Sequence, residues 1–336
     1  MPAEARYYEI HDNKIRCLLC PHHCVVGEGE TGICGARTNS NQRLYTKIYG
    51  GVSSIAMDPI EKKPLYHFYP GSFVLSVGTI GCNLKCPYCQ NWNISQNNSA
   101  KTSFLEPAGL VRAAKAQDSI GIAYTYSEPC IWAEYLLDAG AIARQKGLKN
   151  ILVTNGFINQ APLRDILTIT DAMNIDLKTF NSDTFRKIHK GRLEDVIKTI
   201  EITHSAGCHI ELTTLIVPGI NDTIEEMRKI IAFIKSIDES IPWHISRYFP
   251  AWKYDAAPTD TNFMLRVYEE AAEILPYVYC GNMRGGRVND TYCPSCGTLL
   301  IQRSGFSAEI KSVKSPGVCA KCGFKLNIVM QQIISI

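Results

Sequence analysis

The feature that most constrains this chain is a set of three cysteines, Cys82, Cys86 and Cys89, at C-x3-C-x2-C spacing. They follow the apolar run 73–79, which predicts a strand. A structural zinc ion or an ordinary iron–sulfur cluster takes four protein ligands, so a four-iron cluster held by three thiols leaves one iron open to a small molecule. Spacing alone leaves a zinc-bound or simply buried set open. The loop after the carboxyl end of a strand, however, is where active sites gather in barrel folds.

The composition is that of a globular protein and excludes several classes of function. The formal net charge of +3 comes without a basic block, so neither a nucleic-acid surface nor a polybasic membrane anchor is expected. The longest apolar runs are strand-sized and the first residues contain no signal-peptide core, which predicts a soluble, cytoplasmic protein. Eleven of the fourteen cysteines fall into three tight groups, which favours metal binding in a reducing compartment over disulfides.

Strand and helix patterns alternate through the middle of the chain, as in a parallel sheet. Strands are predicted at 73–79, 120–126, 151–155, 173–178, 209–217, 243–249 and 277–281, and helices at 107–117, 130–147, 161–168, 193–206 and 222–236. Right-handed crossovers would curl such units into an open barrel. The fold class predicted is therefore α/β, with a partial (β/α)6 TIM-like barrel at 71–285, an N-terminal Cys-rich β segment at 1–70 and a C-terminal zinc ribbon at 286–336.

The N-terminal segment contains a second cysteine group, which predicts a closed metal site. Its members are Cys17, Cys20, Cys24 and Cys34, and nearby glycines let the backbone fold tightly around a metal. Structural zinc and an auxiliary [4Fe-4S] cluster are both open, His22 or His23 could replace a thiol, and free thiols are the ordinary alternative. The stretch after this group predicts a pair of β-hairpin strands that turn at Gly50-Gly51.

The C-terminal segment contains two CxxCG knuckles, Cys293 with Cys296 and Cys319 with Cys322. Strand-like stretches, TLLIQRSG, SAEIKSV and FKLNIVMQQ, surround the knuckles. Four thiolates at this spacing predict a zinc ribbon, for which an unmetallated pair of turns is the alternative. Such a ribbon most often stabilises a protein, although some contact nucleic acid or a protein partner.

Polar side chains occur where several predicted strands end. Glu128 follows the strand 120–126, and Asp176 and Lys178 share one face of the strand 173–178 because they stand two positions apart. Two charges on one face of an apolar strand favour a polar barrel interior over an outward ion pair, whereas a solvent-facing turn accounts for Glu128 equally well. The further candidates are Tyr88, Thr154, Asn155, Val217 and His244. Turns, a helix cap and a core histidine are the ordinary explanations for residues of these types.

Together these motifs resemble a known superfamily. The segments GxxGCNLKCPYCQNW, YTYSEP, TNG, DLK, VPGIND and WHISRYFP, in this order, resemble pyruvate-formate-lyase-activating-enzyme-related proteins of the radical S-adenosylmethionine (SAM) superfamily. The N-terminal CxLCPHxC…GxCGxR block and the terminal ribbon narrow the resemblance to the AmmeMemoRadiSam-system radical SAM enzymes. It covers nearly the whole chain. The glycyl-radical activases lack both the N-terminal tetrad and the ribbon, so their protein substrate is not implied.

The resemblance implies roles for the candidate residues. Cys82, Cys86 and Cys89 would hold a [4Fe-4S] cluster with SAM on its fourth iron. Glu128 would accept a hydrogen bond from the SAM ammonium, and Asp176, Lys178 and His244 would surround its carboxylate and ribose. Thr154 and Asn155 suit the ribose, Val217 offers an apolar ledge for adenine, and Tyr88 would pack against adenine or cover the cluster.

The resemblance also implies a reaction, the reductive cleavage of SAM to methionine and a 5′-deoxyadenosyl radical that abstracts hydrogen from a substrate. The electron would come from a one-electron donor of the flavodoxin or ferredoxin type, and AmmeMemo-system proteins are candidate partners. The substrate is open between a protein glycine, as for an activase, and a small molecule, peptide or RNA. The alternative of another class is a non-catalytic zinc protein that contacts nucleic acid or a protein partner.

Overall fold

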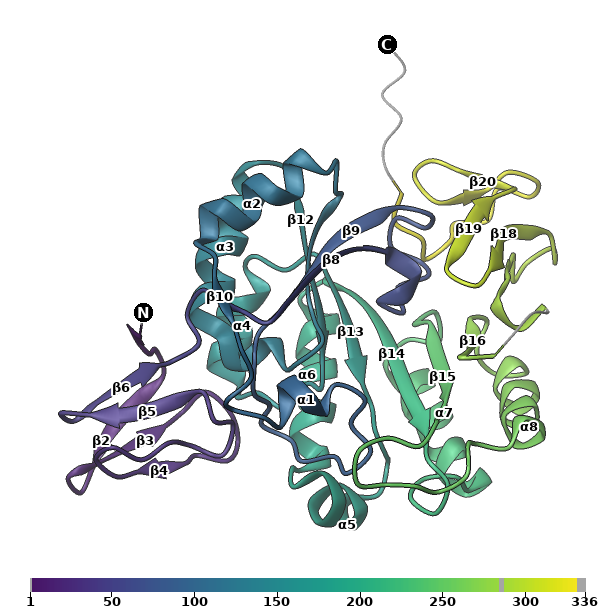
Figure 1. Ribbon diagram of the computed structural model, residues 1–336. Coiled ribbons are helices and arrows are strands. Elements are labelled where there is room, and N and C mark those ends of the chain that lie inside the picture. The colour runs from purple at the N-terminus through teal and green to yellow at the C-terminus, as the bar shows by residue number, and fades with distance from the viewer. Residues whose placement is uncertain (1, 284–286, 331–336) are drawn as a thin grey trace.

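A curved sheet of eight strands forms the centre of the computed structural model, which describes residues 2–283 and 287–330 (Figure 1). Its strand order is β16-β15-β14-β13-β12-β11-β9-β8. The parallel strands are β9 (Phe73–Gly78), β11 (Gly121–Tyr124), β12 (Lys149–Thr154), β13 (Ala172–Asp176), β14 (His209–Ile216), β15 (Trp243–Arg247) and β16 (Val278–Gly281). These correspond to the predicted strands, with ends shifted by a few residues.

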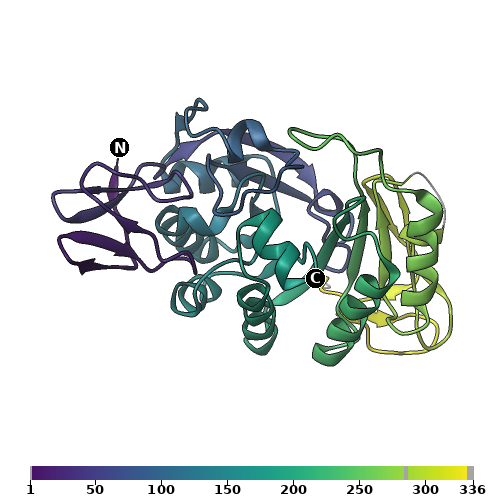
Figure 2. The ribbon, with the colours of Figure 1, turned by 90° about the horizontal axis from the view of Figure 1, so that it is seen from below.

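A helix separates each parallel strand from the next, so every connection is a crossover. The helices are α2 (Pro107–Ala116), α3 (Ala133–Gln145), α4 (Gln160–Leu167), α6 (Leu193–Ser205), α7 (Ile224–Ile237) and α8 (Thr261–Ala272). They lie along the outer side of the curved sheet (Figures 1 and 2), with apolar side chains such as Leu110 on α2 and Ile230 on α7 fully buried. The main core therefore lies between these helices and the sheet, which leaves the strand ends free for other side chains.

The sheet does not close into a complete barrel within the described residues, because β8 and β16 are its two edges. The α/β class and the parallel sheet are thus as predicted. The helix α8 was not predicted. The strand β8 (Ser54–Pro59) overlaps the second strand of the predicted hairpin, but it pairs antiparallel with β9 through all six of its residues. The division of the chain at residues 70 and 285 stays a prediction.

The N-terminal segment forms two small antiparallel sheets that project from one end of the molecule (Figures 1 and 2). Their strands are β1 (Ala3–Glu4), β2 (Tyr8–His11), β3 (Lys14–Cys17), β4 (Val25–Val26), β5 (Arg37–Ser40) and β6 (Arg43–Thr46). The hairpin predicted around Gly50-Gly51 was wrong. A turn forms there, but β6 pairs with β1 and β5, and β7 (Gly51–Val52) pairs with β10 (Ser103–Phe104), since β8 is taken up by the central sheet.

The C-terminal segment lies at the other end, beside β16. It contains β17 (Thr291–Tyr292), β18 (Leu299–Ser304), β19 (Ser307–Ile310), β20 (Val313–Lys314) and β21 (Val318–Cys319). Of the stretch predicted as a further strand, 324–330 forms only isolated bridges and its last two residues lie outside the described ones. Arg303 fixes the segment to the rest of the chain, because its Nη2 donates to the carbonyl oxygen of Tyr66 at 2.7 Å.

Candidate active site

The three-cysteine loop begins directly after β9 and ends at the short helix α1 (Trp92–Ser95). Gly81, which precedes the first cysteine, has a φ of +92°, a conformation that glycine adopts freely. Cys82 Sγ accepts a hydrogen bond from the Leu84 backbone N–H at 3.4 Å, and Cys89 Sγ lies 3.1 Å from the Ser95 hydroxyl oxygen. Hydrogen bonds to the ligand sulfurs are one of the means by which proteins tune iron–sulfur clusters.

The three cysteine groups differ in how closely their sulfurs gather. Throughout residues 2–283 and 287–330, the one set of three or more His, Cys, Asp or Glu ligand atoms within 4.8 Å of one another is the C-terminal tetrad. Its Sγ atoms lie 3.6 Å apart between Cys293 and Cys322 and 3.8 Å apart between Cys296 and Cys319. Four thiolates bound to one zinc at about 2.3 Å are about 3.8 Å apart, so this tetrad fits a single tetrahedral ion. The sulfurs of the three-cysteine loop are spread more widely than that.

A cavity of about 680 Å³ opens at the carboxyl ends of the parallel strands, and the three loop cysteines line it. Ligand pockets of enzymes have this size. The predicted residues that line it are Tyr88, Glu128, Thr154, Asn155, Asp176, Lys178 and His244. The tip of the β18–β19 hairpin, Gly305 and Phe306, also forms part of the wall, although it belongs to the C-terminal segment.

Glu128 is buried and held by its neighbours rather than facing solvent. Its Oε1 accepts hydrogen bonds from Thr154 Oγ1 at 2.6 Å and from the Cys130 N–H at 3.0 Å, and its Oε2 accepts from the Asn155 N–H at 2.8 Å. Burial raises the pKa of Glu128, and these hydrogen bonds partly offset that rise. A carboxylate in this position gains most from a cationic partner in the cavity.

Asp176 ends β13, which stops two residues short of the predicted strand end, and Lys178 follows it in the loop; both line the cavity. Lys178 Nζ lies 2.9 Å from Asp176 Oδ2. Burial disfavours the lysine cation, but Asp176, Cys86 and Tyr88 together raise the pKa of Lys178 well above its ordinary value. Lys178 therefore supplies a fixed positive charge beside the cysteine loop.

The other predicted residues lie in different surroundings. His244 is at the cavity wall, but its Nε2 lies 2.6 Å from Oε2 of the buried Glu211. Tyr88 is buried, with its Oη 2.6 Å from Nε2 of His189. Val217 is fully buried and is not among the residues that line the cavity, so its contact with adenine stays a prediction.

Sequence reasoning missed a group of cavity residues from outside the strand ends. Lys63 and Tyr126 line the cavity, and both bind Asp58 Oδ2, at 2.7 Å each. Although burial opposes ionisation of Asp58, its hydrogen bonds to Lys62, Lys63 and Tyr126 hold its pKa well below the ordinary value. The left-handed φ of +70° at Tyr126 was the kind of signal that only a structure gives.

The donor set of this cavity fits a three-ligand iron–sulfur cluster with SAM beside it. Three thiols, the buried carboxylate of Glu128 and the partly exposed ammonium of Lys178 line a single cavity. Ser127, also in its wall, has a buried hydroxyl oxygen without a hydrogen-bond partner in the described residues. Such an atom is expected where a polar ligand belongs, because an unsatisfied buried hydroxyl is destabilising.

Comparison with known proteins agrees with this geometry. A family model described as Radical SAM superfamily matches residues 76–234. The uncharacterized protein MJ0808 of Methanocaldococcus jannaschii is 42% identical over 334 residues, which is 97% of this chain and 99% of that protein. The pyruvate formate-lyase-activating enzyme of Clostridium pasteurianum is 28% identical over 177 residues, 49% of this chain and 72% of that enzyme.

Among solved structures, Streptococcus suis SuiB bound to S-adenosylmethionine matches with a TM-score of 0.50 and 13% identity, over 68% of this chain and 54% of that chain. At this identity the likeness shows the fold alone. No helix in the part of the chain that the structure describes has the length and apolar character needed to cross a membrane. The family match, the relative similar along nearly the full length and the cysteine loop at the strand ends lead to one conclusion: the chain belongs to the radical SAM superfamily and is related to its activating enzymes.

Proposed function

We propose that this protein is a radical SAM oxidoreductase, with a [4Fe-4S] cluster on Cys82, Cys86 and Cys89 and SAM in the adjoining cavity. When bound, these cofactors supply the reductive cleavage of SAM to methionine and a 5′-deoxyadenosyl radical, which abstracts hydrogen from a substrate. The observation that carries the proposal is that three thiols, which do not gather as closely as those of the C-terminal tetrad, share one cavity with the buried carboxylate of Glu128 and the ammonium of Lys178. A non-catalytic zinc protein does not require that arrangement.

Different residues of the chain bind different groups of SAM. Glu128, fixed by Thr154 and the Asn155 N–H, accepts a hydrogen bond from the SAM ammonium. Lys178, oriented by Asp176, binds the SAM carboxylate. Asn155 and His244, which line the same cavity, face the ribose.

Two substrate classes follow from this proposal. An activase that places a radical on a protein glycine is favoured by the similarity to the Clostridium pasteurianum activating enzyme. Direct modification of a small molecule, peptide or RNA is favoured by the N-terminal tetrad and the C-terminal knuckles, which activases of that type lack. In either case we propose that the protein works in the cytoplasm and receives its electron from a flavodoxin or ferredoxin. AmmeMemo-system proteins are its candidate partners. The C-terminal tetrad is proposed to bind zinc.

The reaction is tested by anaerobic formation of 5′-deoxyadenosine from SAM and a low-potential reductant. Cys86→Ala should abolish the product, whereas Cys208→Ala, at a cysteine outside the three groups, should retain it. Product formation by Cys86→Ala at the wild-type level would refute the proposal. A protein that holds zinc alone after anaerobic reconstitution with iron and sulfide would instead support the binding-protein alternative.

The substrate class is tested with a deuterium-labelled extract. Reduced enzyme and SAM are incubated with its protein, RNA and small-molecule fractions separately, and 5′-deoxyadenosine is examined by mass spectrometry. Label that comes from the protein fraction supports the activase, and label from either of the other fractions supports direct modification. An unlabelled extract gives the background level of deuterium in 5′-deoxyadenosine. If no labelled fraction raises the deuterium content above this background, both substrate classes are contradicted for the organism from which the extract was made.

A further inference from the structure

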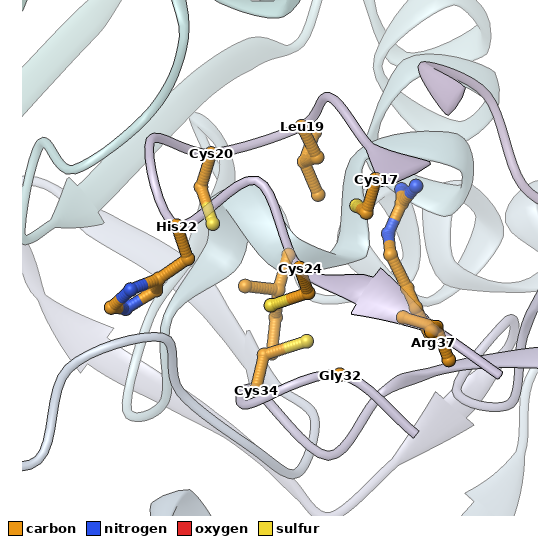
Figure 3. Close-up of a pocket in the computed structure, with 10 residues that line it drawn as sticks. Cys17, Leu19, Cys20, His22, Cys24, Gly32, Cys34 and Arg37 are labelled. Carbon is orange, nitrogen blue, oxygen red and sulfur yellow. The ribbon is translucent and has the colours of Figure 1, made fainter. Parts of the chain in front are cut away.

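The N-terminal cysteine tetrad surrounds a small cavity of its own. Cys17 ends β3, and the other three cysteines lie in the turns that flank β4 and precede β5. Figure 3 shows their sulfur atoms around the space between these turns. Leu19, Val26 and Ile131 complete an apolar wall around the space between the four thiols.

The spread of these sulfurs does not fit one zinc ion. Four thiolates on a single zinc are about 3.8 Å apart and leave no room between them. The C-terminal tetrad has that spacing, whereas in the described residues no three ligand atoms of the N-terminal tetrad lie within 4.8 Å of one another. In this respect the tetrad resembles the three-cysteine loop. In a cluster each thiolate binds a different iron, so its sulfurs stand farther apart than around one ion.

Arg37 gives an independent sign of an occupant that accepts hydrogen bonds. Its side chain is 1% exposed, and it lines the same cavity, beside Cys17 (Figure 3). Nη1 donates to the Arg6 carbonyl oxygen at 2.7 Å and Nη2 to Glu134 Oε1 at 2.5 Å, but the buried Nε–H has no partner in the described residues. A buried N–H without a partner is destabilising, because it has lost its hydrogen bonds to water and gained none in the protein. The thiolates and inorganic sulfides of a cluster are anionic acceptors that would satisfy it.

The two neighbouring histidines each use Nε2 in a contact away from the tetrad, and we take the four thiols as the ligand set. His22 Nε2 lies 2.7 Å from the carbonyl oxygen of Asn83, inside the three-cysteine loop. His23 Nε2 lies 2.9 Å from Asn159 Nδ2. The tetrad is thus tied to the loop by His22, and again by the close approach of the Cys34 carbonyl to Gly81.

We propose that Cys17, Cys20, Cys24 and Cys34 bind a second [4Fe-4S] cluster, which passes one electron from a low-potential donor of the flavodoxin or ferredoxin class to the three-cysteine loop. Four thiolates occupy all four irons, so this cluster has no open iron for SAM and suits electron transfer. The donor loses one electron and the loop site gains it, while no bond is made or broken and no proton is moved. Only the destination of the electron rests on the function proposed above.

The ligand assignment is tested in a variant that leaves the tetrad intact, Cys82→Ala/Cys86→Ala/Cys89→Ala. After anaerobic reconstitution the wild type should hold about eight irons and this variant about four, each with about one zinc, because a [4Fe-4S] cluster has four irons. The reduced variant should give an electron paramagnetic resonance signal that SAM does not change. If this variant held no iron and about two zinc ions, the assignment of a second cluster to the N-terminal tetrad would be wrong. That result would not bear on the SAM site, because the variant lacks the three loop cysteines.

The role in electron transfer is tested in the wild type and in Cys20→Ser/Cys24→Ser. In rapidly frozen samples mixed with reduced flavodoxin, the SAM-insensitive signal should rise before the SAM-sensitive one, and the reverse order would overturn the relay. The tetrad variant should lose flavodoxin-driven cleavage of SAM but keep cleavage with a small chemical reductant. Retention of its zinc and of the SAM-sensitive signal shows that it is folded. Full flavodoxin-driven cleavage in that folded variant would also overturn the relay.

Discussion

The carbonyl oxygen of Cys34 lies so close to Gly81 that a Cβ placed on this glycine would meet it at 2.5 Å. The two residues belong to different cysteine groups, and Gly81 has a φ of +92°. This contact and the bond between His22 and Asn83 hold the N-terminal segment against the three-cysteine loop. The geometry of the loop therefore depends on a segment that precedes the central sheet.

Gly81→Ala should destabilise the protein and lower its iron content, because the new methyl group must displace either Cys34 or the cysteine loop. We expect a loss of about 2 kcal/mol or more in the free energy of unfolding. Gly207→Ala is the matched control, since Gly207 also has a positive φ but open space around its Cα. It should cost only about 1–2 kcal/mol and leave the iron unchanged. Urea unfolding and iron analysis make the comparison, and equal effects of the two substitutions would contradict it.

Glu134→Ala should destabilise the N-terminal segment strongly. It removes the carboxylate that pairs with the Arg37 guanidinium in a pair whose side chains are 1% and 6% exposed. A buried charge left without its partner costs about 3–5 kcal/mol. Glu201→Ala removes one partner of the half-exposed pair between Lys198 and Glu201, and should have little effect on urea unfolding. The prediction fails if the two variants unfold at the same urea concentration.

Glu128→Gln and Lys178→Met should weaken the binding of SAM without loss of the iron. Each removes one charge that faces the cavity, and a hydrogen bond to a charged group contributes about 1.5–3 kcal/mol, so the Kd should rise about 10- to 100-fold. Anaerobic calorimetry with reconstituted protein measures the Kd. Lys149→Met is the control, because Lys149 begins β12 at the opposite end of the strands and should leave binding unchanged. An unaltered Kd in either test variant would remove that residue from the site.

Cys322→Ser should release the zinc of the C-terminal tetrad and leave the iron in place. The four sulfurs are at the spacing of a single tetrahedral ion, and the pKa of Cys296 is lowered to about 6, chiefly by hydrogen bonds from Thr298, which favours the thiolate that zinc requires. Metal analysis should show zinc falling from about one per chain to near none. Undiminished zinc would show that the metal is held elsewhere.

The stability should fall on acidification, in part through His67. Burial lowers the pKa of His67 to about 3 from an ordinary 6.5, so between these values the unfolded chain binds a proton that the folded protein does not. The free energy of unfolding therefore falls as the pH is lowered through this window, by about 2 kcal/mol between pH 7 and pH 5. Urea unfolding at the two pH values should show a smaller fall for His67→Gln. An identical fall in both proteins would contradict this assignment.

Much of the central fold was predictable because its signals are local. Apolar runs and turn residues mark β9 and β11 to β16, and the spacing of Cys82, Cys86 and Cys89 places the loop at a strand end. The alternation of side chains along a strand led to the prediction that Asp176 and Lys178 lie together, and both do line the cavity, although Lys178 lies just beyond the end of β13. The pairing of β8 was predicted wrongly because the sequence around Gly50-Gly51 suits a hairpin equally well, and pairing with β9 is a long-range choice.

The parts of the site that were missed depend on tertiary packing. Lys63 and Tyr126 line the cavity, and both bind the carboxylate of Asp58, which comes from a distant part of the chain. The backbone of Tyr126 is also left-handed, which no local sequence pattern indicates. Val217 ends a predicted strand like the other candidates. Its N–H donates to Asn221 Oδ1 within its own turn, and it is buried and not among the residues that line the cavity, so its contact with adenine stays a prediction. Position at a strand end thus predicts proximity to the site, but not the direction of a side chain.

Through the hairpin tip at Gly305 and Phe306, the C-terminal segment affects the size and shape of the molecules that can enter the cavity. This tip forms part of the cavity wall, and the hydrogen bond from Arg303 to the carbonyl oxygen of Tyr66 fixes the hairpin to the rest of the chain. A longer hairpin, or one with larger side chains, would narrow the cavity without moving the three loop cysteines. Substitutions in this turn should therefore change which molecules enter the cavity and leave the three-cysteine loop unaltered.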